Sequence, residues 1–161
     1  MLSNERISEL IACPKVFKSK PKKIGEKNRN FDQRFDVYGK DNDNIFHVFV
    51  TQSTKMLQDF SIGLICENHL LIRVNGFHGT TKAGFYTAKH HQYPHAHILT
   101  EDDIKNEREL KPSLIEDLTG EFSDLSYALL YFLEKCNIIN YQGYFDNLPN
   151  KNQMSFLGEE W

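Results

Sequence analysis

Hydrophobic and polar positions alternate with a period of two through the middle of the chain, which predicts β-strands. Four successive segments rich in Phe, Val and Ile carry this pattern, and turn-forming segments separate them: residues 31–39, 44–52, 60–67 and 69–75. In the second segment Phe46, Val48 and Val50 fall on one face, which is therefore wholly apolar. Because short loops join antiparallel neighbours, we expect a meander, which residues 82–88 and 93–99 extend to about five or six strands.

Two segments with a helical period flank the expected sheet. In residues 1–12 an apolar stripe recurs at helical spacing behind Ser3, which is a good N-cap. Residues 123–137 give the stronger pattern, an apolar stripe that begins after Ser123. The chain is therefore predicted to be a single α+β domain over residues 1–161, an antiparallel meander sheet packed by an N-terminal helix and a C-terminal helix.

The remaining segments show no regular period and are assigned by composition. Residues 141–161 are turn-rich and predict an irregular tail, while residues 31–100 hold the sheet together with a histidine-rich loop. Residues 15–30 are predicted to be a basic connector, because eight bases between Lys15 and Arg34 face only two acids. Two interpretations of that run stay open: a solvated, mobile connector, or a phosphate-binding arm in which interleaved phenylalanines stack on unpaired bases.

Charge, cysteine content and hydropathy narrow the class of protein. The formal net charge of -3 excludes a polycation, so contact with RNA requires a local basic patch. Three widely spaced cysteines, Cys13, Cys66 and Cys136, indicate neither a disulfide framework nor a cysteine zinc site. The sequence has no apolar run of about 18 residues, as a membrane span needs, and Glu5 and Glu9 interrupt the segment that a signal peptide would use. We therefore expect a cytoplasmic protein without membrane contact.

Histidine is concentrated in one stretch, between Arg73 and Ile98. Five of the seven histidines lie there: His78, His90, His91, His95 and His97. In an extended Pro-His-Ala-His-Ile segment His95 and His97 project from the same face, so both imidazoles can act on one group of substrate atoms. Histidine titrates near neutral pH and is the commonest metal ligand, so such a density points to chemistry rather than to folding.

Acid–base cleavage of RNA is the reaction that this stretch suits best. Without a metal, the reaction needs a base for the 2′-hydroxyl proton, an acid for the leaving oxygen and a cation for the phosphorane. We predict His95 and His97 as the proton-transfer groups. The predicted supporting residues are Arg73, on the phosphate, and His78, which positions the substrate. Further substrate contacts are assigned to Lys89, His90, His91, Asn75 and Tyr93. No cofactor is predicted for this reaction.

Two other interpretations of the histidines stay open. A His-x-His strand joined by His78 or His90 can bind a divalent metal through imidazole nitrogens, although no acidic residue between Glu67 and Glu101 supplies a carboxylate. Alternatively, the histidines hold a folded loop by hydrogen bonds, and the protein is a non-enzymatic interaction module, such as an antitoxin-like or phage-defence accessory protein. An enzyme is favoured, because so many histidines in one stretch are unusual for a structural role.

The same residues resemble a known family, the TumE-type toxins of bacterial toxin–antitoxin pairs, and a related group of small bacterial proteins. The similarity lies in the order of two motifs, which read here Arg73-x-Asn75-x-x-His78 and His90-His91-x-x-Pro94-His95-x-His97. It covers about residues 60–139, and it departs from the toxins after Pro94, where His-Ala-His replaces two adjacent histidines. The resemblance implies a small single-domain bacterial toxin that acts on RNA and is paired with a cognate antitoxin protein. A homodimer is a further alternative.

Overall fold

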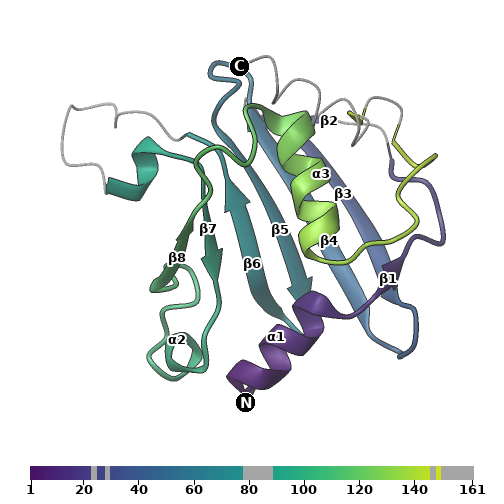
Figure 1. Ribbon diagram of the computed structural model, residues 1–161, viewed down its shortest axis with the longest axis vertical. Coiled ribbons are helices and arrows are strands. Elements are labelled where there is room, and N and C mark those ends of the chain that lie inside the picture. The colour runs from purple at the N-terminus through teal and green to yellow at the C-terminus, as the bar shows by residue number, and fades with distance from the viewer. Residues whose placement is uncertain (23–24, 28–29, 78–88, 146–147, 150–161) are drawn as a thin grey trace.

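The computed structural model describes residues 1–22, 25–27, 30–77, 89–145 and 148–149, and only the backbone of Lys27, Lys89 and His91. Within these ranges the chain forms both helices and strands (Figure 1). The helices are α1 (Asn4–Ala12), the 3-10 helix η1 (Lys89–Gln92), α2 (Glu101–Lys105) and α3 (Leu125–Lys135). The strands are β1 (Lys15–Val16), β2 (Gly25–Lys27), β3 (Asn30–Gly39), β4 (Ile45–Ser53), β5 (Phe60–Cys66), β6 (His69–Asn75), β7 (His95–Ile98) and β8 (Leu114–Asp117).

The eight strands of the described chain belong to one sheet, in which every neighbouring pair is antiparallel. From β3 to β8 the order in the sheet follows the order in the chain, while β1 and β2 both pair with β3. This confirms the predicted α+β domain with an antiparallel meander. The structure has more strands than the five or six that were predicted. The additional strands β1, β2 and β8 span only two to four residues, which is too short for an alternating pattern to be visible in the sequence. The strand predicted at residues 82–88 lies outside the described residues.

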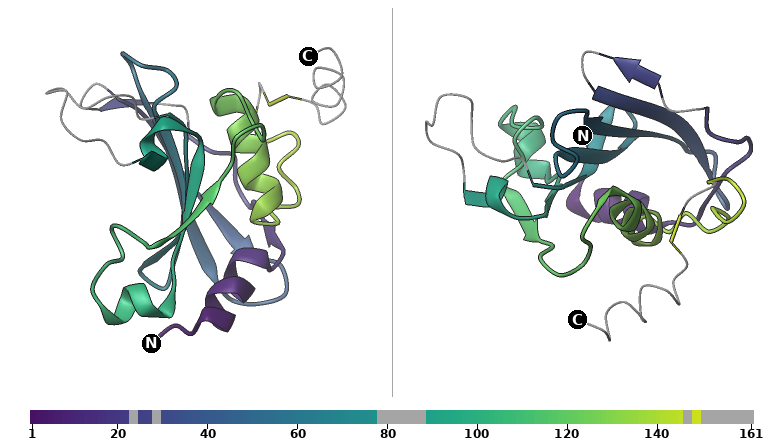
Figure 2. Two further views of the ribbon diagram at one scale, coloured as in Figure 1. Left: turned by 60° about the vertical axis from the view of Figure 1, so that its left-hand side comes forward. Right: turned by 90° about the horizontal axis from the view of Figure 1, so that it is seen from above.

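The two longer helices cover one face of the sheet, where the apolar positions of the strands lie. Figure 2 shows α1 and α3 on the same side of the sheet. Val48, Ile62 and Val74, from three adjacent strands, are buried in one cluster with Leu10 of α1 and Phe132 of α3. Burial of this apolar surface is the main driving force for folding. The predicted packing of the sheet by an N-terminal and a C-terminal helix is confirmed.

Side-chain caps determine where these helices begin. The Ser3 hydroxyl accepts a hydrogen bond from the Arg6 N–H at 3.1 Å, so α1 has the predicted cap. In α3 the cap is Asp124, whose carboxylate accepts from the Tyr127 N–H at 3.0 Å. The predicted cap, Ser123, lies one residue earlier. Both residue types are good caps, so sequence alone does not choose between two adjacent ones.

The basic run after α1 is not solvated at its start. Lys15 on β1 is fully buried, and its ammonium donates to the carbonyl oxygens of Ile11, Cys13 and Cys136 at 2.7, 2.9 and 2.7 Å. These carbonyls lie at the C-terminal ends of α1 and α3, where a cation is favoured. Burial lowers the pKa of Lys15. The prediction of a solvated connector is therefore wrong for Lys15, which ties the two helix ends together.

Two phenylalanines of the same run belong to the core. Phe17 and Phe35 are buried, with ring centroids 5.3 Å apart, and Phe17 also stacks on Tyr144 at 4.9 Å. Phe31, by contrast, is exposed. Phe17 and Phe35 are therefore not available to stack on bases, which corrects the interpretation of this run as an arm with interleaved aromatic residues. Tyr144 shows that the described start of the predicted tail packs against the hydrophobic core.

Gly63 on β5 allows a side chain from the neighbouring strand to lie directly over the sheet. A Cβ at this position would fall 2.2 Å from Cε1 of Phe49 and 2.9 Å from Cδ1 of Leu70. The register places Gly63 opposite Phe49 on β4 and opposite Arg73 on β6. The group that approaches Gly63 most closely is therefore the aromatic ring of Phe49, and only a residue without a Cβ leaves room for it.

The three cysteines are free thiols, in agreement with the predicted lack of a disulfide framework. Burial raises the pKa of Cys136 to about 12, with an opposing effect from nearby Lys15. In the described ranges, no helix combines the length and the apolar character needed to cross a membrane.

Candidate functional site

Strand register brings the predicted site residues together on the face of the sheet that α1 and α3 leave open. β6 and β7 pair with Arg73 opposite His97 and Asn75 opposite His95. Residues directly opposite one another project from the same face, whereas Val74 projects from the other face into the helix-covered core. The ring centroids of His95 and His97 lie 4.9 Å apart, which confirms that the two imidazoles share a face.

A third imidazole joins this pair from η1, the 3-10 helix that precedes β7. The ring centroid of His90 lies 5.0 Å from that of His95 and 5.3 Å from that of His97. One ring nitrogen from each histidine lies within 4.8 Å of the other two. His95 is fully buried and His97 is 6% exposed, whereas His90 is half-buried. We call His90, His95 and His97 the histidine trio.

Hydrogen bonds orient the ring of His95. Its Nδ1 lies 2.9 Å from the carbonyl oxygen of Tyr93, and a carbonyl only accepts, so Nδ1 carries a proton. Its Nε2 lies 3.2 Å from the amide nitrogen of Asn75, whose oxygen accepts from the Ser61 hydroxyl at 2.6 Å. In the neutral ring Nε2 therefore accepts from Asn75. Asn75, predicted to contact the substrate, is thus a residue that orients an imidazole.

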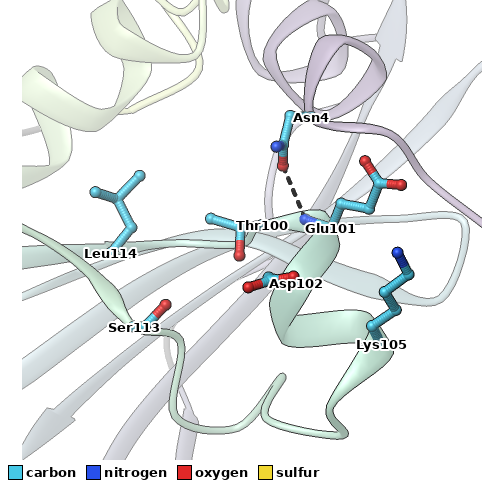
Figure 3. Close-up of a pocket in the computed structure, with 7 residues that line it drawn as sticks. All are labelled: Asn4, Thr100, Glu101, Asp102, Lys105, Ser113 and Leu114. Atoms are coloured by element: carbon cyan, nitrogen blue, oxygen red, sulfur yellow. Dashed lines mark hydrogen bonds between the residues drawn. The ribbon is translucent and has the colours of Figure 1, made fainter.

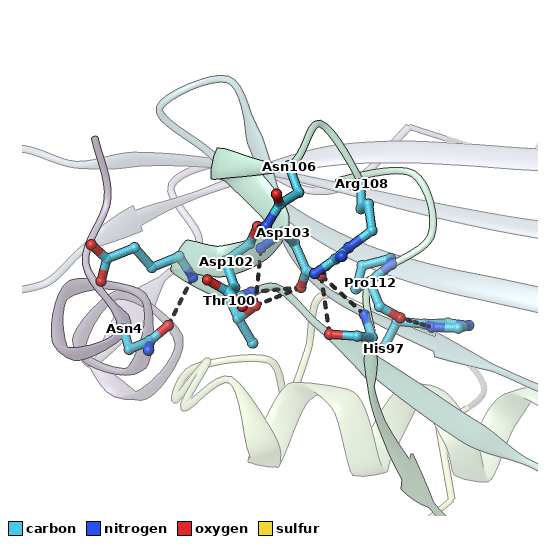
Figure 4. Close-up of polar contacts among 10 residues, drawn as sticks. Asn4, His97, Thr100, Asp102, Asp103, Asn106, Arg108 and Pro112 are labelled. Carbon is cyan, nitrogen blue, oxygen red and sulfur yellow. Dashed lines mark hydrogen bonds and ion pairs between the residues drawn. The ribbon is translucent and has the colours of Figure 1, made fainter.

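The loop between α2 and β8 holds His97 (Figure 4). The Nδ1 atom of His97 faces the carbonyl oxygen of Pro112 at 3.4 Å. The next residue, Ser113, donates from its N–H and its hydroxyl to Asp103, at 3.2 and 3.1 Å. Asp103 is fully buried and also accepts from the N–H and hydroxyl of Thr100, at 3.0 and 2.8 Å. Asp103 therefore fixes the loop whose carbonyl faces His97.

Asp103 is an acidic residue at a helix N-terminus, a position at which carboxylates are usually solvated. The capping box between Thr100 and Asp103 is present, but the carboxylate is buried. Burial alone would raise the pKa of Asp103, yet the hydrogen bonds from Thr100 and Ser113 outweigh it and hold that pKa below its usual value. The Arg108 guanidinium lies 3.6 Å from the same carboxylate. The acid is therefore a structural anchor.

Two charged residues flank the trio. Arg73, opposite His97, has a pKa lowered by burial, and among the described residues its Nε is buried without a hydrogen-bond partner. A guanidinium nitrogen in this situation is one that a bound anion would satisfy. Asp117 on β8 lies opposite His95 and is exposed. The hydroxyl and N–H of Thr119 hold the pKa of Asp117 below its usual value, with a smaller contribution from His95.

The structure gathers most of the predicted site residues. Those that meet on this face of the sheet are His90, His95, His97, Arg73 and Asn75. Tyr93 contributes its carbonyl, and its ring centroid lies 6.1 Å from that of His95. Lys89 and His91 belong to η1, where only their backbone is described. His78 lies outside the described residues.

Three residues of the site escaped the sequence prediction: Ser61, Asp103 and Pro112. Ser61 reaches Asn75 because the register pairs them across β5 and β6, and a single sequence does not display register. Pro112 lies in a loop that is distant in sequence from His97. The Thr-x-x-Asp spacing of Thr100 and Asp103 is typical of a capping box, and this signal could have marked Asp103 as an ordered residue.

A separate surface hollow lies near the starts of α1, α2 and β8 (Figure 3). Its lining residues are Asn4, Thr100, Glu101, Asp102, Lys105, Ser113 and Leu114. The Asn4 side-chain oxygen accepts from the Glu101 N–H at 2.8 Å across it. None of these residues belongs to the trio, and this hydrogen bond joins α1 to α2. We therefore assign the hollow to the packing of the two helices.

The chain belongs to a family of unknown function, DUF6978, whose model matches residues 2–138. This range contains each helix and strand described above, the histidine trio and the residues that orient it. No curated protein and no solved structure matches the chain. The fold and site described above therefore lie within the part of the chain that defines the family.

Proposed function

We propose that this protein is a small bacterial ribonuclease of the toxin type, which cleaves RNA by acid–base catalysis at the histidine trio and needs no cofactor for that reaction. The observation that carries the proposal is the placement of Arg73 directly opposite His97, beside two further imidazoles. Cleavage of a phosphodiester at a ribose requires groups that take and give protons and a cation for the developing charge. The trio and Arg73 supply both.

In the proposed reaction the 2′-oxygen of a ribose attacks the adjacent phosphorus. One imidazole takes the 2′-hydroxyl proton as the bond between O2′ and phosphorus forms. A second imidazole, in its protonated form, gives a proton to the 5′-oxygen as the bond from phosphorus to that oxygen breaks. The products are a 2′,3′-cyclic phosphate and a 5′-hydroxyl end. Arg73 stabilises the negative charge on the non-bridging oxygens.

Burial suggests how the three imidazoles divide this work. His95 has no exposed surface, while His97 has a small exposed fraction and His90 is half-buried. The sequence prediction paired His95 with His97 as the proton-transfer groups. The burial of His95 favours His90 and His97 as the groups that reach the substrate. His95 then acts behind them, with its ring about equally close to both.

The amide of Asn75 suits a histidine whose proton count changes. With neutral His95 it donates to Nε2, as the structure has it. If Nε2 gains a proton, it becomes a hydrogen-bond donor. The Asn75 amide can then rotate so that its oxygen accepts a hydrogen bond from Nε2, while its nitrogen donates to the Ser61 hydroxyl. Both protonation states are then hydrogen-bonded. This property supports a role for His95 in passing or holding a proton.

The test is cleavage of a labelled RNA by purified, tag-free protein in a buffer that contains a chelator. We expect products that end in a cyclic phosphate, and no cleavage where the ribose at the scissile position is replaced by deoxyribose. His97→Ala should lower the rate by about 100-fold or more, the usual contribution of a general acid or base. His47→Ala is the matched control, because His47 is an exposed histidine of the same sheet that pairs with Asp36.

Full cleavage by a folded His97→Ala variant would remove the trio from the reaction. Intact RNA after incubation with folded wild type would favour the alternative, an interaction module in which the histidines are structural. In cells, we propose that the protein acts in the cytoplasm and that a cognate antitoxin protein holds it inactive. Expression of wild type, but not of His97→Ala, should then arrest growth.

A further inference from the structure

The three imidazoles of the trio lie close enough together for one ion to contact them all. One nitrogen each from His90, His95 and His97 lies within 4.8 Å of the others. A tetrahedral zinc ion with bonds of about 2.0–2.1 Å holds its ligand nitrogens roughly 3.4 Å apart. The nitrogens must therefore approach one another by at most about 1.4 Å, which rotation of the side chains can supply. Of the three, His90 on η1 is the only one whose side chain is not buried.

We infer that His90, His95 and His97 form a binding site for one divalent transition-metal ion of the zinc class. This inference goes beyond the proposed ribonuclease activity and does not rest on it. The three ligands are all imidazoles, with no carboxylate among them. Imidazole nitrogen suits zinc, copper, nickel and iron, whereas magnesium, calcium and manganese prefer oxygen ligands. Three histidines also leave a fourth position for water or an anion.

Backbone carbonyls orient two of the rings in the way that is usual for metal ligands. The Nδ1 atom of His95 donates to the carbonyl of Tyr93, and Nδ1 of His97 faces the carbonyl of Pro112. Histidines that bind a metal almost always use their second ring nitrogen in this manner, which directs Nε2 to the ion. At His95 the ion takes the place of the Asn75 amide, which retains its contact with Ser61.

Arg73 provides an independent argument for an anionic group beside this site. It lies opposite His97, and among the described residues its buried Nε has no hydrogen-bond partner. An anion at the fourth position of the metal would bring a negative charge toward this guanidinium. A metal ion held by three histidines, with Arg73 beside it, would therefore bind a small anion or an oxygen atom of a phosphate group.

The experiment is a metal titration of tag-free protein that has been freed of metal with a chelator and then freed of the chelator. Calorimetry with Zn²⁺ should give one ion per chain, and Co²⁺ should give the intense visible absorption of four-coordinate cobalt. Mg²⁺ should give no signal. His90→Ala is the main variant, because its half-buried side chain can be removed without opening the core. We expect Zn²⁺ affinity to fall by at least about 100-fold, the upper end of the cost of losing an outer partner of a metal site.

His97→Ala should show the same loss, and His47→Ala should bind Zn²⁺ as wild type does. Absence of binding by folded wild type, or undiminished binding by both His90→Ala and His97→Ala, would overturn the site. The metal site and the ribonuclease activity can be contradicted independently of each other. If the metal-free protein cleaves RNA but does not bind Zn²⁺, only the metal site is contradicted. If the protein binds one Zn²⁺ and leaves RNA intact, only the ribonuclease activity is contradicted.

Discussion

Asn75 and Ser61 determine which atoms donate and which accept hydrogen bonds around the neutral ring of His95. Because Nδ1 of His95 donates to a carbonyl, the Asn75 amide must donate to Nε2 of the neutral ring, and the Ser61 hydroxyl must donate to the amide oxygen. The chain of donors therefore runs in one direction, from β5 through β6 to β7. A change at Asn75 interrupts it in the middle, which makes this residue the one whose replacement is most informative.

Asn75→Ala should lower the free energy of unfolding by about 1–3 kcal/mol, because it removes the Asn75 hydrogen bonds to a buried imidazole and to the half-buried Ser61 hydroxyl. Asn75 has no exposed surface, so water does not reach its place without rearrangement. Urea unfolding followed by circular dichroism measures the change. The exposed amide of Gln58 provides the control, since Gln58→Ala should be nearly neutral. Equal stability of Asn75→Ala and wild type would contradict the proposed network.

The period of two in the sequence was enough to place His95 and His97 on one face, because alternation of side chains is a property of any strand. The partners of these histidines were not predictable in the same way. Ser61 depends on strand register, and Pro112 depends on the path of a loop. His90 was predicted only as a substrate contact, and its ring lies beside those of both His95 and His97 because η1 directly precedes β7.

At the scale of elements, the segment from α2 to β8 holds the ring of His97 in place. Asp103 of α2 holds Ser113, which follows the Pro112 carbonyl that faces His97 (Figure 4). Since the hydrogen bonds from Thr100 and Ser113 hold the pKa of Asp103 below its unfolded value, the ionised carboxylate stabilises the fold. That contribution is present above the unfolded pKa of about 3.9 and is lost as the pH falls through the folded pKa.

Asp103→Asn should therefore be less stable than wild type by about 1–3 kcal/mol at pH 7, since an amide cannot accept all four hydrogen bonds. The difference should narrow as the pH falls below the unfolded pKa of about 3.9, because the unfolded wild-type carboxylate then takes up a proton before the folded one does. Urea unfolding at several pH values measures this. Asp102→Asn, which removes an exposed carboxylate from the same helix, should be nearly as stable as wild type at pH 7 and serves as the matched control. A difference that stays constant down to pH 3 would rule out the assigned role.

Lys15 links two other elements, the C-terminal ends of α1 and α3. Lys15→Met keeps most of the aliphatic length but removes the three hydrogen bonds to the carbonyls. We expect a loss of about 1.5–3 kcal/mol in the free energy of unfolding, because hydrogen bonds to charged groups are among the stronger ones. Lys40→Met, at an exposed lysine, should stay within about 0.5 kcal/mol of wild type. A Lys15→Met variant as stable as wild type would show that the burial cost of the ammonium cancels its bonds.

The elements that were predicted well from the sequence are the long ones, in which the hydrophobic period repeats several times. β3, β4, β5 and β6 each contain at least seven residues, so alternation is visible, and α3 shows three turns of apolar stripe. Lys15 was misjudged for a physical reason. A lysine in a basic run is usually solvated, and only the meeting of two helix ends creates enough carbonyl oxygens to bury one.

At the scale of the molecule, the two faces of the sheet carry different kinds of side chain. One face is apolar and packs under α1 and α3, and the other carries the trio and Arg73. Proton transfer and metal binding would use the same nitrogens on that second face. An imidazole nitrogen that binds a metal cannot take up a proton, so the two activities should exclude each other.

Zn²⁺ should therefore inhibit RNA cleavage by the wild type. The rate should fall in proportion to occupancy, with a midpoint equal to the dissociation constant from calorimetry, and a chelator should restore it. Mg²⁺ at the same concentration serves as the control for non-specific effects of a divalent ion on RNA. An increase in rate with Zn²⁺ would contradict the acid–base mechanism and assign the reaction to the metal.

The meander also has a consequence for the order in which the molecule assembles. β6, η1, β7, α2 and β8 follow one another along the chain. The hydrogen bonds that orient His95 and His97 therefore join residues at most 20 positions apart, and they close loops at a lower entropic cost than contacts between the chain ends do. The contact of Lys15 with the Cys136 carbonyl joins positions 121 residues apart. We expect the half of the sheet that carries the histidines to form early and the ends of the chain to be fastened late. Damage to that late fastening should then shorten the lifetime of the folded state while leaving the shape of the site intact.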